Sequence, residues 1–284
     1  MTCTFSVGSL KQSDTLKNVL NSCFTEYNMS SPIKDNNKGN YTFYTINLPY
    51  DETEHFASML AEFILNYCEE ILISQIVKQQ YYYFSPEERE KIHSKAMEIL
   101  NPSSGTHESY RDRRKRRVQE KIVNYLAFNK ELILEGFINF RLKDYCYELE
   151  LAVEEAVDDY LIEKEYDEFI RLLKYFVDIQ EPKIKKVHVV LENTGYFRLY
   201  DEENKLINND YLEGFIVELM DDEINYEDLL ISALITIAPE IVILHQSKNA
   251  STKSTVKTIR SVFGERVKDC EGCEKCSHLT HSKN

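Results

Sequence analysis

The sequence predicts an α+β protein with a central helical bundle packed against small sheet elements from the N- and C-terminal parts. Three observations predict this class. Apolar residues recur every three or four positions through the middle of the chain, as in amphipathic helices. Near both ends, short segments are instead rich in β-branched and aromatic residues, as in strands. The composition, 43% hydrophobic and 29% charged with few Gly and Pro, is that of a globular protein.

Changes in this pattern divide the chain into four parts that we expect to share one core. They are a strand–helix–strand unit (1–50), a helical region (51–181), a mixed α/β region (182–269) and a Cys/His tail (270–284).

The N-terminal unit is predicted from a change of period. "TCTFSVGS" alternates between apolar and polar residues, and "SDTLKNVLNSCF" then adopts helical spacing from an N-cap at Ser13. "YTFYTINLP" predicts a second strand that ends at Pro49. The polar "MSSPIKDNNKGN" between them predicts a turn-rich connection.

The middle of the chain predicts successive helices. The first covers about Glu52 to Gln80. Ser85-Pro86-Glu87-Glu88 begins the next, because Ser85 and Glu88 form a capping box and proline suits the first turn. That helix ends before "NPSSGT", and a third covers residues 107–128. Further helix continues through Ile179, before Pro182.

The last third alternates strands and helices. "KIKKVHVVLEN" and "YFRLYDEENKLI" predict a hairpin or a short meander around a turn at residues 193–195. "YLEGFIVELM" and "YEDLLISALITIA" predict helices, the second ending at Pro239. "EIVILHQ" predicts a strand, "TVKTIRSVFGE" a helix and "RVKDC" a last strand. Strand–helix–strand order favours a parallel pair with a right-handed crossover.

Charge and hydropathy narrow the class of protein. A formal net charge of −14 argues against broad coating of DNA, which needs an extended positive surface. No secretory signal is visible at the N-terminus, and the most apolar window, Leu229 to Leu244, is shorter than a membrane-spanning helix. Seven cysteines without a signal peptide do not indicate a disulfide framework. We therefore expect a soluble cytoplasmic protein without a transmembrane segment.

The tail "CEGCEKCSHLTH" carries the strongest chemical motif. Cys270, Cys273 and Cys276 are separated by two residues each, a spacing that lets successive sulfurs converge in a turn eased by glycine. Three thiolates and one nitrogen form a common tetrahedral zinc set, and His281, or His278 as the alternative, is the expected fourth ligand. The same spacing occurs in iron–sulfur proteins. A frayed tail with unliganded thiols and redox chemistry are further alternatives.

A basic run, "YRDRRKRRVQEK", is the best candidate for an anionic partner such as nucleic acid or anionic lipid. The alternative, which we favour, is a solvated helix face paired with the surrounding acids. The run comprises Arg111, Arg113, Arg114, Lys115, Arg116 and Arg117.

No catalytic constellation emerges from the remaining motifs. The chain lacks His-Glu-x-x-His, G-x-S-x-G and the phosphate-binding glycine loops. His188 and His245 lie in apolar strands, where we expect core histidines rather than catalysts. An enzyme is therefore not the favoured interpretation.

Several longer segments add a resemblance. "EKEYDEFIRLLKYFVDIQEPKI" followed by "VHV", then "EDLLISALITIAP", then "FGERV" leading into "CEGCEKC" occur in this order. Together they resemble the YtxC-like family of sporulation proteins from endospore-forming bacteria, over about Gly136 to Cys276. The resemblance implies a cytoplasmic protein connected with sporulation, and it carries over Cys270, Cys273 and Cys276 as part of the family pattern.

The favoured function is that of a soluble, non-enzymatic sporulation protein that acts through contacts with protein partners. Two alternatives are a nucleic-acid-binding regulator that uses residues 111–117, and a zinc or iron–sulfur protein.

Overall fold

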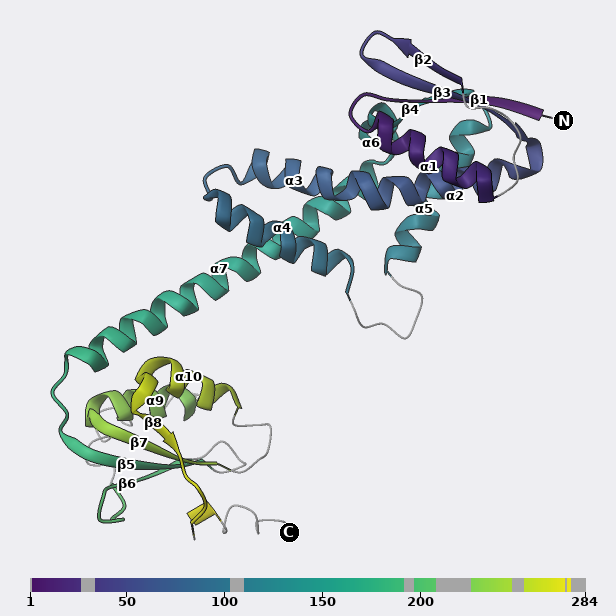
Figure 1. The fold of residues 1–284 in the computed structure, drawn as a ribbon. Helices are drawn as coiled ribbons and strands as arrows, with labels where there is room; N and C mark the ends of the chain where they lie inside the picture. Colours follow the sequence, from purple (N-terminus) through teal and green to yellow (C-terminus); the bar gives the residue numbers. More distant parts are fainter. Residues whose placement is uncertain are drawn as a thin grey trace. The chain divides into compact units, whose positions relative to one another are not determined.

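The computed structural model confirms an α+β fold (Figure 1). The chain divides into two compact units, residues 1–162 and 163–284, which we describe separately. The structure describes residues 2–26, 34–102, 110–191, 197–207, 226–246, 253–273 and 275–276.

The first unit contains a four-stranded sheet in the order β2-β3-β1-β4. β1 pairs antiparallel with β3, although strand–helix–strand order favours a parallel pair, because after α1 (Ser13–Glu26) the hairpin of β2 and β3 reverses the chain. β2 and β4 were not predicted. The strands are β1 (Thr2–Ser9), β2 (Lys34–Lys38), β3 (Tyr41–Pro49) and β4 (Glu131–Ile133).

The side chains of β2 and β4 show no alternation of apolar and polar residues. Only backbone pairing with a neighbouring strand identifies them as strands. β2, "KDNNK", is polar and exposed, and it pairs with β3 across a turn where Gly39 has a φ of 62°. β4 is three residues long and pairs parallel with β1. Neither segment is long or apolar enough to show a period of two.

Helices make up most of the first unit. The predicted helix over residues 52–80 is confirmed, with a π-helical turn, η2, inside it. The predicted capping box is confirmed, since the Glu88 amide donates to Ser85 Oγ and the Ser85 amide donates to the Glu88 carboxylate. The bounds are η1 (Tyr50–Glu52), α2 (Thr53–Phe63), η2 (Ile64–Cys68), α3 (Glu69–Gln80), α4 (Pro86–Leu100), α5 (Tyr110–Leu126), α6 (Leu134–Arg141) and α7 (Lys143–Ile179).

The second unit contains a four-stranded sheet in the order β6-β5-β7-β8. β5 and β6 form the predicted antiparallel hairpin, and the predicted parallel pair is confirmed for β7 with β8. β5 also pairs parallel with β7. The predicted turn at residues 193–195 and the predicted helix at residues 211–220 lie outside the described residues. The bounds are β5 (Ile184–Leu191), β6 (Phe197–Tyr200), α9 (Tyr226–Ile237), β7 (Pro239–Gln246), α10 (Lys253–Phe263), η5 (Gly264–Arg266) and β8 (Val267–Asp269).

The expectation of a single core differs from the structure, in which each unit has a core of its own. The helix α7 contributes to both. Leu149 and Val153 are buried in the first core, whereas Ile170 and Val177 are buried in the second. Helical periodicity locates an apolar stripe but does not say which partner covers it, so the sequence did not separate the two cores.

Each strand of the second sheet presents alternate residues to the core. Val187 and Val189 of β5 and Leu244 of β7 pack in the core with side chains of α9 and α10. Figure 1 shows both helices on one side of the sheet. Because successive strand residues point to opposite faces, His188 and His245 lie on the face away from this core.

Candidate metal centre

The candidate metal centre lies where the parallel strands β7 and β8 end. Leu244 pairs with Asp269, and the amide of Cys270 continues the ladder by donating to the carbonyl of Leu244 at 3.0 Å. Cys270 therefore follows β8 directly beside His245 of β7. Carboxyl ends of parallel strands meet at one edge, which brings together residues that are far apart in sequence.

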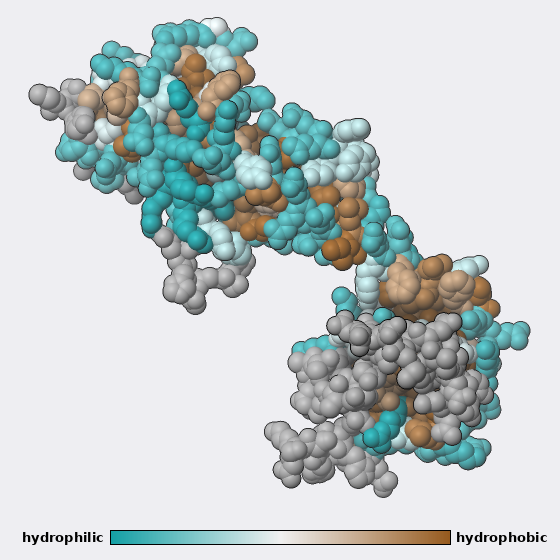
Figure 2. All heavy atoms as spheres, turned by 180° about the vertical axis from the view of Figure 1, so that it is seen from behind, coloured by the Kyte–Doolittle hydropathy of each residue, from teal (hydrophilic) through white to brown (hydrophobic). Residues whose placement is uncertain are grey.

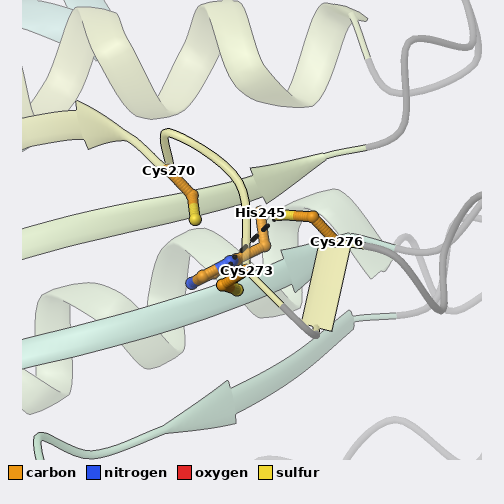
Figure 3. Close-up of side chains that lie close together, drawn as sticks. All are labelled: His245, Cys270, Cys273 and Cys276. Carbon is orange, nitrogen blue, oxygen red and sulfur yellow. Dashed lines mark hydrogen bonds between the residues drawn. The ribbon is translucent and has the colours of Figure 1, made fainter.

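One ligand atom from each of His245, Cys270, Cys273 and Cys276 lies within 4.8 Å of all the others. His245 Nδ1 is 3.3 Å from the sulfur of Cys273 and 3.4 Å from that of Cys276. Figure 3 shows the thiols arranged around the His245 ring. Bond lengths of about 2.3 Å to sulfur and about 2.0 Å to nitrogen place tetrahedral zinc ligands roughly 3.6–3.8 Å apart. The four residues could therefore hold one metal ion.

The turn after β8 brings the thiols together. Gly272 has a φ of 123°, a backbone conformation that other residues rarely adopt. The amide of Cys276 then donates to the carbonyl of Cys273 at 2.9 Å, which closes the turn. The glycine between the first two thiols was singled out from the sequence for this role, and the observed backbone agrees with it.

The surroundings shift the pKa values of Cys273 and Cys276 in opposite directions. At Cys273 burial raises the pKa, but hydrogen bonds from the backbone at Cys276 and Lys275 and from neighbouring thiols outweigh burial and lower it. At Cys276 burial, followed by the neighbouring Cys270, raises the pKa to about 11. Thiols that share hydrogen bonds cannot all ionise without a compensating charge, and a metal ion supplies that charge.

His245 is held by a second histidine. Its side chain is buried, and its Nε2 lies 2.9 Å from Nδ1 of His188 on β5. Burial, followed by His188 and Lys275, lowers the pKa of His245 to about 4, so the ring is neutral at neutral pH. When Nε2 carries the proton and donates it to His188, Nδ1 keeps a free lone pair towards the thiols.

A cation sits beside this cluster. The Nζ atom of Lys275 lies 3.5 Å from the centre of the Tyr200 ring, and Tyr200 pairs with His188 across β6 and β5. This contact attaches the cysteine turn to the hairpin by a cation–π interaction. Three thiolates, one neutral imidazole and a divalent ion carry a net negative charge, which the nearby ammonium group offsets.

The structure thus brings together the three predicted cysteines and adds a candidate ligand, His245, that sequence reasoning missed. His245 was expected to be a core histidine; it is buried, but its Nδ1 faces the thiols. The predicted fourth ligands, His278 and His281, lie outside the described residues. No local spacing could identify His245, because strand pairing rather than sequence distance brings it to Cys270.

The basic run of α5 lies in the first unit, where several of its members form ion pairs with acidic side chains. Arg111 and Lys115 both pair with Glu62, the latter at 2.8 Å, and Arg117 contacts both oxygens of Glu148 at 2.6 and 2.7 Å.

Two further arginines of the run differ sharply in environment. Arg113 is exposed and lies over the Tyr110 ring at 4.4 Å. Arg114 is buried, and it donates to Glu69 at 3.2 Å and to the Leu100 carbonyl at 2.7 Å. The fold therefore directs part of this positive charge inward.

Among the described residues, no helix combines the length and apolar character that crossing a membrane requires. The six cysteines whose side chains are described are free thiols.

Comparison with known proteins identifies the family of the chain. A relative from Bacillus subtilis (strain 168), "Uncharacterized protein YtxC", is 28% identical over 216 residues, which cover 74% of each chain. No solved structure matches the chain. The model of the YtxC-like family matches residues 54–268, a span that includes His188 and His245 and ends two residues before Cys270. The chain therefore belongs to the YtxC-like family.

Proposed function

We propose that Cys270, Cys273, Cys276 and His245 bind one zinc ion that stabilises the C-terminal part of the second unit. The observation that supports this proposal is the convergence of four ligand atoms within 4.8 Å. Three thiolates and one imidazole complete a tetrahedral set, so no position stays open for a substrate. The ion is therefore structural, and the protein acts without chemistry at this centre.

The compactness of the cluster favours one ion over an iron–sulfur cluster. In a four-iron cluster each protein ligand binds a different iron atom, so the ligand atoms stand further apart than around one ion. Here two of the sulfurs lie 3.3 and 3.4 Å from the same nitrogen. Sulfur-rich tetrahedral sets that contain a histidine suit zinc.

At the level of the whole protein, we propose a cytoplasmic protein that acts in sporulation through contacts with other proteins. The resemblance to sporulation proteins supports a role in sporulation. The absence of a recognisable catalytic motif in the sequence supports contacts rather than catalysis. Deletion of the gene in the source organism should lower the yield of heat-resistant spores, and normal sporulation of the deletion strain under several conditions would contradict this role.

Metal analysis of the chain, purified without an affinity tag or chelator, tests the zinc centre. We expect one zinc ion per chain in the wild type and less than about a tenth of an equivalent in Cys273→Ser and His245→Phe. His278→Ala and His281→Ala are the matched controls and should retain full zinc. Iron with visible charge-transfer absorbance would show an iron–sulfur cluster, and freely titratable thiols without metal would show an empty tail.

A further inference from the structure

The second half of α7 is apolar on two sides, and the core of the second unit covers one of them. Ile170, Leu173 and Val177 pack in that core. The other side carries large apolar side chains at the surface. They are Phe169, Leu172, Tyr175, Phe176 and Ile179, with exposed fractions of 53, 52, 61, 42 and 58%. Hydrophobic surface is visible on both units in Figure 2.

The exposed side follows the spacing of a two-stranded coiled coil. Glu165, Phe169, Leu172, Phe176 and Ile179 succeed one another by alternating steps of four and three residues. This is the heptad repeat that keeps one seam of a helix facing a partner helix. We call these five residues the α7 seam. Four of them are apolar, and Glu165 is the one charged member.

The exposed area is close to what a stable interface needs. With about 200 Å² for each large side chain, the five exposed residues leave roughly 500 Å² of apolar surface in water. Two such surfaces together reach roughly 1,000 Å², the total area that a biological protein–protein interface is expected to bury at least. In a chain with a mean hydropathy of −0.44, a patch of this size on one helix marks a contact surface.

We propose that a second copy of this chain covers the α7 seam, with the two helices antiparallel. A two-fold interface uses the same patch on both partners, so the patch must be complementary to itself. In the antiparallel register, Phe169 lies opposite Leu172 of the second copy. The same register sets Ile179 opposite Ile162 of the second copy, an α7 residue that is 66% exposed.

Charge decides the direction of the second helix. A parallel pair would place the two Glu165 carboxylates against each other inside an apolar seam, where like charges are strongly unfavourable. The antiparallel pair separates them and sets each one opposite Phe176 of the second copy. Glu165 therefore disfavours the parallel arrangement.

Sedimentation analysis of the full chain tests the interface. At a chain concentration of about 100 μM, the wild type should sediment as a dimer of the 33.4 kDa chain. The double variant Phe169→Glu with Leu172→Glu should sediment as a monomer at the same concentration. Phe140→Glu is the matched control, since Phe140 is 73% exposed on α6, and it should remain dimeric. Equal helicity and zinc content in all variants establish that each one is folded. A monomeric wild type, or a dimer that the seam variant leaves intact, overturns the proposal.

The direction of the helices has its own test. Antiparallel pairing sets residue 176 opposite Glu165 of the second copy, so Phe176→Lys should dimerise at least about tenfold more tightly than Phe176→Glu. Adding Glu165→Lys to Phe176→Glu should restore dimerisation. In a parallel pair, residue 176 would meet its own copy, and both single variants would weaken the dimer equally. Equal weakening, or failure of the double variant, overturns the antiparallel arrangement.

Discussion

The basic run of α5 and the cysteine cluster after β8 are the two segments where the sequence concentrates one chemical group, and the fold treats them in opposite ways. Arginines of the run form ion pairs with acids of the same unit, and Arg114 is buried against Glu69. The cysteines instead face one another and a histidine from another strand. Members of the basic run are paired with acids inside the fold, while the other set of groups is arranged so that it could hold a metal ion.

This difference shows that the number of like residues in a short segment does not indicate how many of them can bind a partner or a metal ion. Six basic residues within seven positions offer less free charge than the sequence suggests, because Glu62 alone pairs with two of them. Three cysteines offer more chemistry than the sequence suggests, because strand pairing adds His245. The two regions also lie in different units, so each can be perturbed while the other serves as an internal control.

The largest effect on stability is expected from Arg114→Met. The substitution leaves the Glu69 carboxylate, whose side chain is 2% exposed, without its buried counterion. We expect a loss of about 3–5 kcal/mol in the free energy of unfolding of the first unit, measured by denaturant unfolding. Zinc content of the second unit should not change.

The control for this variant is Arg113→Met. Arg113 is exposed and its described contact is the Tyr110 ring, so the loss should be about 0.5–1 kcal/mol. Equal losses for both variants would contradict the distinction between a buried and an exposed member of the basic run.

A smaller effect is expected from His188→Phe, which tests how the metal centre is positioned. The variant removes the acceptor at 2.9 Å from Nε2 of His245, so the ring loses its preferred tautomer and orientation. Zinc affinity, measured by competition with a chelator, should fall by about 10- to 100-fold. His188→Gln retains an acceptor and should recover part of the affinity. Unchanged affinity in His188→Phe would show that His245 needs no such support.

A still smaller effect is expected from Glu62→Gln, and it depends on pH. Burial alone would raise the pKa of Glu62, but hydrogen bonds from Lys115 and Arg111 outweigh burial and lower it to about 2. A lowered folded-state pKa stabilises the protein above the unfolded pKa, and this contribution is lost as the pH falls towards 2. The wild type should exceed the variant by at most about 1 kcal/mol at pH 7, since water screens this partly exposed group.

The difference between wild type and Glu62→Gln should therefore shrink as the pH falls from about 4.5 to about 2, in unfolding curves recorded across this range. Glu98→Gln, an exposed position on α4, is the control. A gap that stays constant down to the lowest pH would show that Glu62 contributes by packing rather than by charge.

The smallest effect is expected on nucleic-acid binding. Because Glu62 and Glu148 pair with members of the basic run, we expect the wild type not to be retained on heparin or DNA at low salt. Retention that falls steeply with salt and disappears when Arg113 and Arg116 are replaced by Gln would contradict this and favour a nucleic-acid-binding regulator.

The sequence by itself determined the elements with a strong local signal. The capping box at Ser85, the end of α9 before Pro239 and the strands on both sides of α10 follow from hydrogen-bonding groups and periodicity within a few residues. The three cysteines were equally visible, because two-residue spacing and a glycine are local properties of the chain.

Tertiary structure alone decided how distant segments meet. The polar strand β2 exists through its backbone pairing with β3, and α7 divides its apolar residues between two cores. His245 joins Cys270 because β7 and β8 are parallel neighbours, although 24 residues separate the two in sequence. Strand pairing and core packing depend on which surfaces meet in space, and a pattern of neighbouring residues carries no information about that choice.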